Sequence, residues 1–389
     1  MPLPQPRAGR VLRIKERPLE FSFWPMERTT RRYGLGTRVF ATDAWTVIRR
    51  SAERRCIAAH RNAALALLEQ GEDFYRASES GVKAAKPLLL YYCFMNLAKA
   101  FVLTCQQRHD VNNAQHGLAE RLDPPPNDRE LVNAYLNAFQ TAPAGPLPPA
   151  GNNLNNFDEL LLAISGNAVP ANPHRYDLPV LLPQIVPGHR LWVEGTRGDD
   201  SERFVSVEKI EFYQEPGPKH IWLRLFVFAD DLRRVGITHQ DLLNRSRIGG
   251  LFREVAYNET ISDRSLVCLE QLNPVTYGHR PSDEVPNLVA AVRHLLWRTV
   301  LSTPPYRKHY LYAAPPAEHP QVLPQILSIY AITYYLGSIV RYRPHHFDRI
   351  LADNFGPFIE AFLNDQPKQF LYLMASEFAE KEVTKAAIV

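Results

Sequence analysis

Two arginines and two histidines stand together in the run RYRPHH, which begins at Arg341. An imidazole can move a proton to or from a ribose 2′-hydroxyl, and an arginine can stabilise charge that builds on a phosphate. Arg341 and His346 have four residues between them, at the C-terminal end of the last long apolar helix. Arg343 and His345 would then assist in binding the nucleic acid or another anion. The alternative is structural, because cations near a helix C-terminus are stabilising by themselves.

The spacing alone is weak evidence for this chemistry. The chain has 35 arginines and 13 histidines, and about three or four Arg–His pairs with four to six spacer residues are expected by chance. Arg55 and His60 match as well. Position favours Arg341 and His346, because Pro344 should end the preceding apolar helix, over about 322–343, and leave both side chains at a loop opening.

A second apolar stretch, 87–105, contains Asn96 and Lys99 three residues apart, so both should lie on one face of a helix. Buried polar groups need partners, so they either pair with the last long helix or line a polar pocket that it shares. His116 follows, and Gly117 after it predicts a turn with an unusual backbone angle. These three polar residues are candidates for anion binding, with structural pairing as the alternative. The stretch is long enough to cross a membrane, but its two polar side chains favour a buried helix.

The remaining patterns predict an α+β fold. A long helix should run from Thr42 to about residue 75 and pack antiparallel against the apolar helix. The segment HIWLRLFVF at 220–228 alternates in the two-residue period of a strand, and RLWVEG at 190–195 reads similarly. The chain is predicted to have five parts: an extended arm (1–40), half of a helical bundle (41–122), a Pro/Asn-rich connector (123–187), a mostly antiparallel sheet region (188–313) and C-terminal helices that complete the bundle (314–389). Short helices are predicted in the connector at 129–139 and 157–164, and another helix in the sheet region at 287–301. The last C-terminal helix should be broken or divided into two.

Composition excludes several classes of protein. Hydrophobic residues at 45% and charged residues at 22% are typical of a globular chain and not of a disordered one. The four cysteines have no zinc or redox spacing, so no metal or cofactor is predicted. The N-terminus lacks the apolar core of a secretory signal, which favours the cytoplasm over export. Arginine outnumbers lysine 35 to 10, which fits either phosphate contacts or a GC-rich coding genome.

Three motifs in order resemble the YaaC-like proteins, a bacterial family whose biochemical role is not settled. They are KPLLLYYCFMNLAKAFVL from Lys86, the run His116-Gly117-Leu118, and the late SIVRYRPHHFDRIL. The resemblance covers about residues 40–370. The first helical pair is similar, more distantly, to HEPN domains, helical bundles common in toxins and defence proteins that bind or cut RNA.

Together these observations predict a cytoplasmic, RNA-associated protein with a bundle that is HEPN-like in part. The HEPN resemblance implies metal-independent RNA cleavage at Arg341 and His346 and a role in phage defence. The alternative is a non-catalytic interaction protein whose bundle mediates dimerisation or docks a partner encoded in the same operon. An enzyme acting on a small anionic ligand is a third reading. No membrane association is predicted.

Overall fold

The computed structural model describes residues 2–14, 16–25, 38–81, 83–105, 111, 114–122, 130–141, 154–198, 200–300 and 308–385. They form a mixed α/β protein in which most of the sheets are antiparallel. The chain divides into two compact units. The helical unit takes residues 43–199 and 321–379, and the sheet unit takes 1–42, 200–320 and 380–389. The prediction of helices combined with antiparallel sheet is therefore confirmed in its coarse form.

In the described part of the chain, four long helices and several shorter ones form most of the helical unit. Its α-helices are α1 (Ala44–Arg55), α2 (Ala58–Glu79), α3 (Lys86–Cys105), α4 (Glu130–Asn133), α5 (Asn156–Ser165), α6 (Leu178–Leu181), α7 (His189–Gly195), α11 (Gln325–Tyr342), α12 (Pro344–Ala352) and α13 (Gly356–Ala379). A 3₁₀ turn, η1 (Leu182–Gln184), and the strands β5 (Leu118–Leu122), β6 (Ala134–Ala138) and β7 (His174–Asp177) complete it.

The single long helix predicted from Thr42 is divided into two helices, α1 and α2, so the prediction of one continuous helix was wrong. Asp43 caps α1, because its carboxylate accepts the backbone N–H groups of the next helical turn. The chain leaves the helix at Cys56, whose backbone is extended. The break frees the Cys56 carbonyl, which accepts a hydrogen bond of 3.2 Å from Arg61. A polar side chain therefore satisfies the group that the interruption exposes.

Helices α2 and α3 pack antiparallel, as predicted. Phe74 stacks on Tyr92 with 5.4 Å between ring centroids, and Gln70, one turn earlier on α2, accepts a 2.8 Å hydrogen bond from Asn96, one turn later on α3. In the described part of the chain α3 is the one helix long and apolar enough to cross a membrane, and 67% of its most apolar stretch is buried inside the protein.

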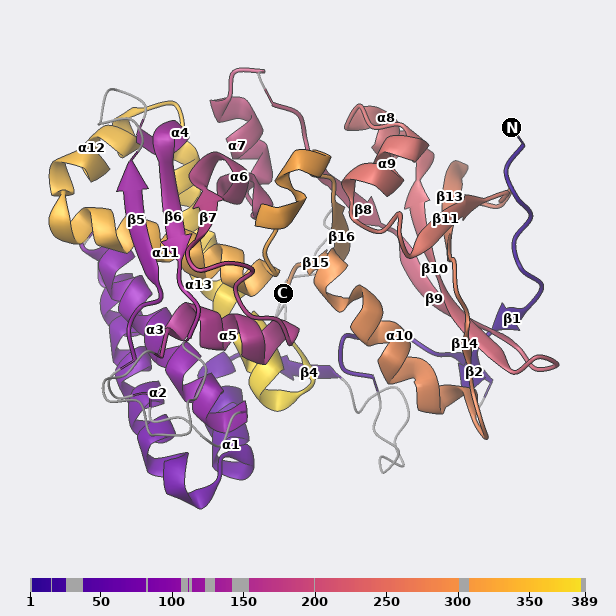
Figure 1. The fold of residues 1–389 in the computed structure, drawn as a ribbon, viewed down its shortest axis with the longest axis horizontal. Helices are drawn as coiled ribbons and strands as arrows, with labels where there is room; N and C mark the ends of the chain where they lie inside the picture. The colour runs from indigo at the N-terminus through magenta and orange to yellow at the C-terminus, as the bar shows by residue number, and fades with distance from the viewer. Residues whose placement is uncertain are drawn as a thin grey trace. The chain divides into compact units, whose positions relative to one another are not determined.

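A small antiparallel sheet lies where the sequence predicted a connector with helices. Strands β5, β6 and β7 run side by side, with β6 in the centre (Figure 1). The helix predicted at 129–139 was wrong beyond residue 133. Ala134, Leu136 and Ala138 are buried in alternation, so the period is two and the segment pairs on both edges as a strand. The helix predicted at 157–164 is α5 and is confirmed.

The C-terminal helices pack on α3. Helix α11 matches the predicted apolar helix, and α13 is continuous through Pro367, so the predicted break was wrong. Phe370, near that proline, stacks on Phe94 of α3 with ring centroids 3.8 Å apart, and such packing offsets the hydrogen bond that proline removes. The predicted strand at 190–195 is helix α7, because Trp192 stacks on Phe355 beside α13 at 4.6 Å.

The sheet unit is built on one antiparallel sheet and several short pairings. Its main sheet has the order β1 (Arg10–Val11), β9 (Lys209–Glu215), β10 (His220–Phe228), β13 (Arg264–Gln271), β11 (Phe252–Val255), with β12 (Thr260–Ile261) on β13 and β14 (Val275–Thr276) on β10. A second sheet joins β15 (Leu296–Arg298), β16 (His309–Tyr312) and β8 (Phe204–Val207). The pairs β2 (Arg13–Ile14) with β3 (Arg17–Pro18) and β4 (Arg38–Ala41) with β17 (Glu382–Lys385) are separate, the latter being parallel. Its helical elements are α8 (Ala229–Arg234), α9 (His239–Arg245), η2 (Pro281–Glu284), α10 (Val285–Val292), η3 (Arg293–Leu295) and η4 (Pro316–Gln321).

Strand β10 confirms the predicted alternation. Ile221 and Leu225 enter the main core on one face, where residues of α8, α9 and α10 cover the sheet. Phe226 and Phe228 enter a second cluster on the other face. The helix predicted at 287–301 ends instead at Val292, because the backbone that follows pairs as β15 with β16.

One buried carboxylate on the sheet holds three arginines. Glu270 of β13 has no exposed side-chain surface, and its oxygens lie 2.8 Å from Arg224, 3.1 Å from Arg253 and 3.6 Å from Arg7. Its Oε2 also accepts the backbone N–H of Arg7 at 3.0 Å. Arg224 stacks at 3.9 Å on the ring of Tyr213. This cluster anchors the N-terminal arm on the main sheet.

Candidate anion site between helices α3 and α11

A small pocket lies between α3 and α11 in the helical unit. Its volume is about 60 Å³, and it is lined by Leu88, Tyr91, Tyr92, His116, Tyr334, Gly337, Ser338, Arg341 and Tyr342. Gly337 is what lets the helices meet here. A Cβ at that position would lie 3.0 Å from the Cβ of Tyr91 and 3.2 Å from the carbonyl oxygen of Pro87. The predicted packing of the two apolar helices is thus confirmed.

Tyr91 and His116 form the polar centre of the pocket. The Tyr91 hydroxyl lies 2.5 Å from Nδ1 of His116. Burial, followed by the neighbouring hydroxyls of Tyr330 and Tyr334, raises the pKa of Tyr91 far above its usual value of 10, so the hydroxyl keeps its proton. Tyr91 therefore donates and His116 Nδ1 accepts. In a neutral imidazole the proton then sits on Nε2, which can donate a hydrogen bond.

The surroundings keep His116 neutral. Burial lowers its pKa below 6.5, and the positive charges of Lys99 and Arg341 lower it further, while Glu120 acts in the opposite direction. Burial also lowers the pKa of Lys99. Tyr334 of α11 is tied to the start of β5, because its hydroxyl donates a hydrogen bond to the carbonyl oxygen of Leu118 at 2.8 Å. The turn at Gly117 has φ +76°, which confirms the unusual angle predicted there.

Arg341 stands at the rim of the pocket, in the last turn of α11. Its guanidinium donates to the hydroxyl of Tyr92 at 3.1 Å and lies 5.0 Å from the ring centre of Tyr342. Tyr342 is 64% exposed, which is unusual for a large aromatic residue. The rim thus combines a cation with an exposed aromatic ring.

The predicted site residues separate into two groups. His116 and Arg341 line the pocket, and Lys99 is close enough to act electrostatically on His116. Asn96 lies outside the pocket, is 2% exposed and donates a hydrogen bond to Gln70 of α2. Both predicted alternatives for Asn96, pairing with the last long helix and lining a pocket shared with that helix, were therefore wrong.

The residues after Arg341 do not lie at a loop opening, so that prediction was wrong. Helix α11 does end at Tyr342, but α12 begins at once with Pro344, because proline suits the first turn of a helix. His345 is exposed and His346 is 6% exposed, and their rings meet edge to face at 4.3 Å. Arg343 is the half-buried residue that joins the two helices. Neither these two histidines nor Arg343 line the pocket.

The doubled tyrosines supply part of the pocket, a role that the sequence patterns did not predict. The doubled tyrosines at 91–92 and 334–335 are mostly buried, with Tyr91 4% and Tyr334 6% exposed, and Tyr91, Tyr92 and Tyr334 also line the pocket. The available signal was the pair of Tyr-Tyr motifs on two helices predicted to pack together. Among the described residues no group of three or more His, Cys, Asp or Glu side chains could hold a metal ion.

The fold and the pocket define a two-unit, mixed α/β protein with a small basic recess in its helical unit. Residues 23–378 match the family described as YaaC-like Protein, so the chain belongs to the YaaC-like family. No curated protein matches the chain, and no solved structure matches it either. These comparisons give no support to the more distant HEPN resemblance.

Proposed function

We propose that this YaaC-like protein binds RNA and seats a backbone phosphate in the pocket between α3 and α11. The observation that carries the proposal is that Arg341 and His116 line one recess, while Lys99 is close enough to act electrostatically on His116. Arginine and other charged or N–H donors are the groups that proteins use to hold phosphate oxygens.

The size of the pocket supports a polymer over a free small molecule. A volume of about 60 Å³ is comparable to that of two water molecules at ~30 Å³ each, so only a group of a few atoms fits. The rest of the ligand must lie outside. Tyr342, exposed beside Arg341, offers a ring on which an unpaired base can stack, as in single-stranded nucleic-acid binders.

The protonation pattern favours binding over cleavage at this pocket. His116 Nδ1 is occupied by the Tyr91 hydroxyl, so the ring acts as a donor through Nε2. To serve as a general acid it would need to draw the Tyr91 proton, and burial raises the pKa of that hydroxyl. Metal-independent cleavage by Arg341 and His346, an HEPN-like bundle and a role in phage defence remain predictions from the resemblance.

The test is binding of a labelled single-stranded RNA 12-mer, followed by fluorescence anisotropy at several salt concentrations. Arg341→Ala should weaken binding and reduce the slope of log K against log salt by about one phosphate contact, roughly 0.7. Tyr342→Ala should weaken binding with little change in the slope. Arg50→Ala is the matched control, because Arg50 is exposed on α1 and lies outside the pocket.

Equal affinities for the Arg341→Ala and Arg50→Ala proteins would refute the site, and failure of the wild type to bind would favour the interaction-protein alternative. The same samples, incubated with EDTA and run on a gel, report cleavage. Cleavage that survives His346→Ala would remove that residue from any reaction.

A further inference from the structure

A second, larger pocket lies in the sheet unit beside the C-terminal end of α9. Its volume is about 460 Å³, and it is lined by Gln240, Leu243, Asn244, Arg247, Gly249, Gly250 and His319. This α9 pocket is within the size range of small-ligand sites, about 300–1,000 Å³. Nearly all of its lining side chains are polar, so its ligand must be polar as well.

Arg247 occupies a backbone position that normally belongs to glycine. Helix α9 ends at Arg245 with Ser246 as its cap, and Arg247 follows with φ +61°. This left-handed position after a helix is usually Gly, since a side chain there is strained. Strained residues persist where their side chain has a use, and they cluster at ligand sites. Arg247 is one of the residues that line the pocket.

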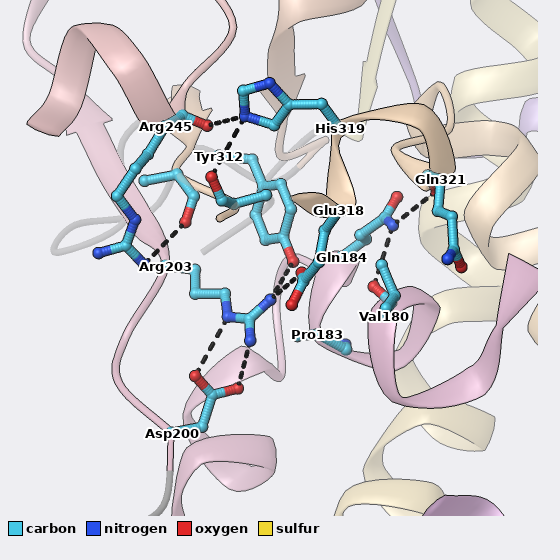
Figure 2. A network of polar contacts seen from close by, with 12 residues as sticks. Val180, Pro183, Gln184, Asp200, Arg203, Arg245, Tyr312, Glu318, His319 and Gln321 are labelled. Carbon is cyan, nitrogen blue, oxygen red and sulfur yellow. Dashed lines mark hydrogen bonds and ion pairs between the residues drawn. The ribbon is translucent and has the colours of Figure 1, made fainter. Parts of the chain in front are cut away.

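His319 of η4 lines the same pocket and is held in place by hydrogen bonds to the backbone. Its Nε2 lies 3.1 Å from the carbonyl oxygen of Arg245 and 3.3 Å from that of Ala314, so Nε2 carries a proton and donates. Figure 2 shows the other ring nitrogen turned away from these carbonyls, and this nitrogen can accept a hydrogen bond.

The carboxylate next to His319 is paired with a buried arginine. Glu318 accepts a 2.6 Å hydrogen bond from the buried Arg203, which also pairs with Asp200 at 2.9 Å (Figure 2). Arg203 shares its single positive charge between Glu318 and Asp200, so it offsets the charge of Glu318 in part. The same ion pairs hold the η4 turn rigid, and a preorganised turn costs less to order when a ligand binds.

Two amides on α9 complete the polar lining. Gln240 and Asn244 are four residues apart and lie on one face of the helix. Gln240 donates to the side-chain oxygen of Asn244 at 3.3 Å. That bond leaves the Gln240 oxygen as an acceptor and the Asn244 nitrogen as a donor. Paired donors and acceptors of this kind recognise the edges of bases and sugars. Gly249 keeps the loop close, because a Cβ there would lie 2.6 Å from the Leu243 carbonyl oxygen.

We propose that the α9 pocket binds a small phosphate monoester with a polar body, the chemistry shared by sugar phosphates and nucleoside monophosphates. Arg247 holds the phosphate, Gln240 and Asn244 contact the body, and Nδ1 of His319 accepts a hydrogen bond from a ligand hydroxyl. The proposal is independent of RNA binding in the helical unit, because it concerns other residues and a small ligand.

Isothermal titration calorimetry with the full chain tests the proposal, using inorganic phosphate, ribose 5-phosphate and adenosine 5′-monophosphate as probes. Arg247→Gly removes the guanidinium and relieves the strained φ, so the variant should be at least as stable as the wild type and yet bind ten times more weakly or worse. Asn244→Asp, which adds a negative charge at constant shape, should also weaken binding at least tenfold.

Lys219→Gly is the matched control. Lys219 is an exposed cation at φ +56° in the turn between β9 and β10, outside the pocket. Its replacement also removes a charge and relieves a positive φ, so affinity should not change. Tighter binding of the ribose or nucleotide probe than of phosphate would show that the body is recognised. Absence of binding of all three probes at millimolar concentration, or unchanged affinity in Arg247→Gly, overturns the proposal.

Discussion

Replacement of Glu270 by Gln should destabilise the sheet unit strongly. The carboxylate has no exposed surface and faces three guanidiniums, whose side chains are 6% exposed for Arg224, 36% for Arg253 and 22% for Arg7. Arg253 and Arg7 can turn toward solvent, but Arg224 cannot. Removing one partner of a buried pair leaves an uncompensated charge and costs about 3–5 kcal/mol. Because Gln keeps one hydrogen-bond acceptor, we expect about 3 kcal/mol, the lower end of that range.

Amide hydrogen exchange read by mass spectrometry is the appropriate assay, since the two units need not unfold together. The opening free energies of β10 and β13 should fall by the full amount, and peptides of the arm around Arg7 should exchange faster. Glu254→Gln is the control, because its partner His239 is 45% exposed, and such surface pairs contribute about 1 kcal/mol or less. A double change of Arg224 and Glu270 to Met should recover most of the loss. A loss below about 1 kcal/mol in Glu270→Gln would refute the reasoning that the buried charge controls this region.

Two further predictions concern the turn at the helical pocket. The pKa of His116 is lowered below 6.5 in the folded protein. Just below pH 6.5 the unfolded chain therefore binds a proton at His116 more readily than the folded protein does. The contribution of His116 to stability is present above pH 6.5 and is lost as the pH falls below it. His116→Gln should flatten this part of the stability curve in urea titrations between pH 5 and 7.5, and identical curves would contradict the assignment. Gly117→Ala should cost about 1–2 kcal/mol for its φ of +76° and more for the new Cβ, which would lie 2.9 Å from the Asn155 Cβ. Gly166→Ala, at φ +73° with open space around it, isolates the backbone cost in the same assay, and equal losses would show that Gly117 has no packing role.

Local patterns predicted those features that depend on near neighbours in the chain. The two-residue alternation of β10, the apolar stripes of α3 and α11 and the turn at Gly117 are all confirmed. Each follows from backbone periodicity or from the steric limits of one residue. Because α3 and α11 are apolar over most of their surface, their burial against other helices was also predictable.

Local patterns failed where a distant partner decided the element. The segment 134–138 is a strand because β5 and β7 flank it, and 296–298 is a strand because β16 pairs with it. Conversely, RLWVEG is a helix because Trp192 packs beside α13. In each case tertiary contacts outweighed propensity, whose differences are about 1 kcal/mol or less per residue.

The sequence by itself determined which residues are able to hold an anion, since only side-chain chemistry is needed to recognise arginine, histidine and lysine as candidates. Their grouping was decided by the tertiary structure. Arg341 meets His116 because Gly337 lets two helices approach closely, while His346 enters a new helix and Asn96 turns to Gln70. Arg247 and His319 are distant in sequence and face one pocket because the backbone of the sheet unit fixes both. The spacing of residues along a chain does not predict which distant side chains share a pocket, because this depends on packing between helices and strands.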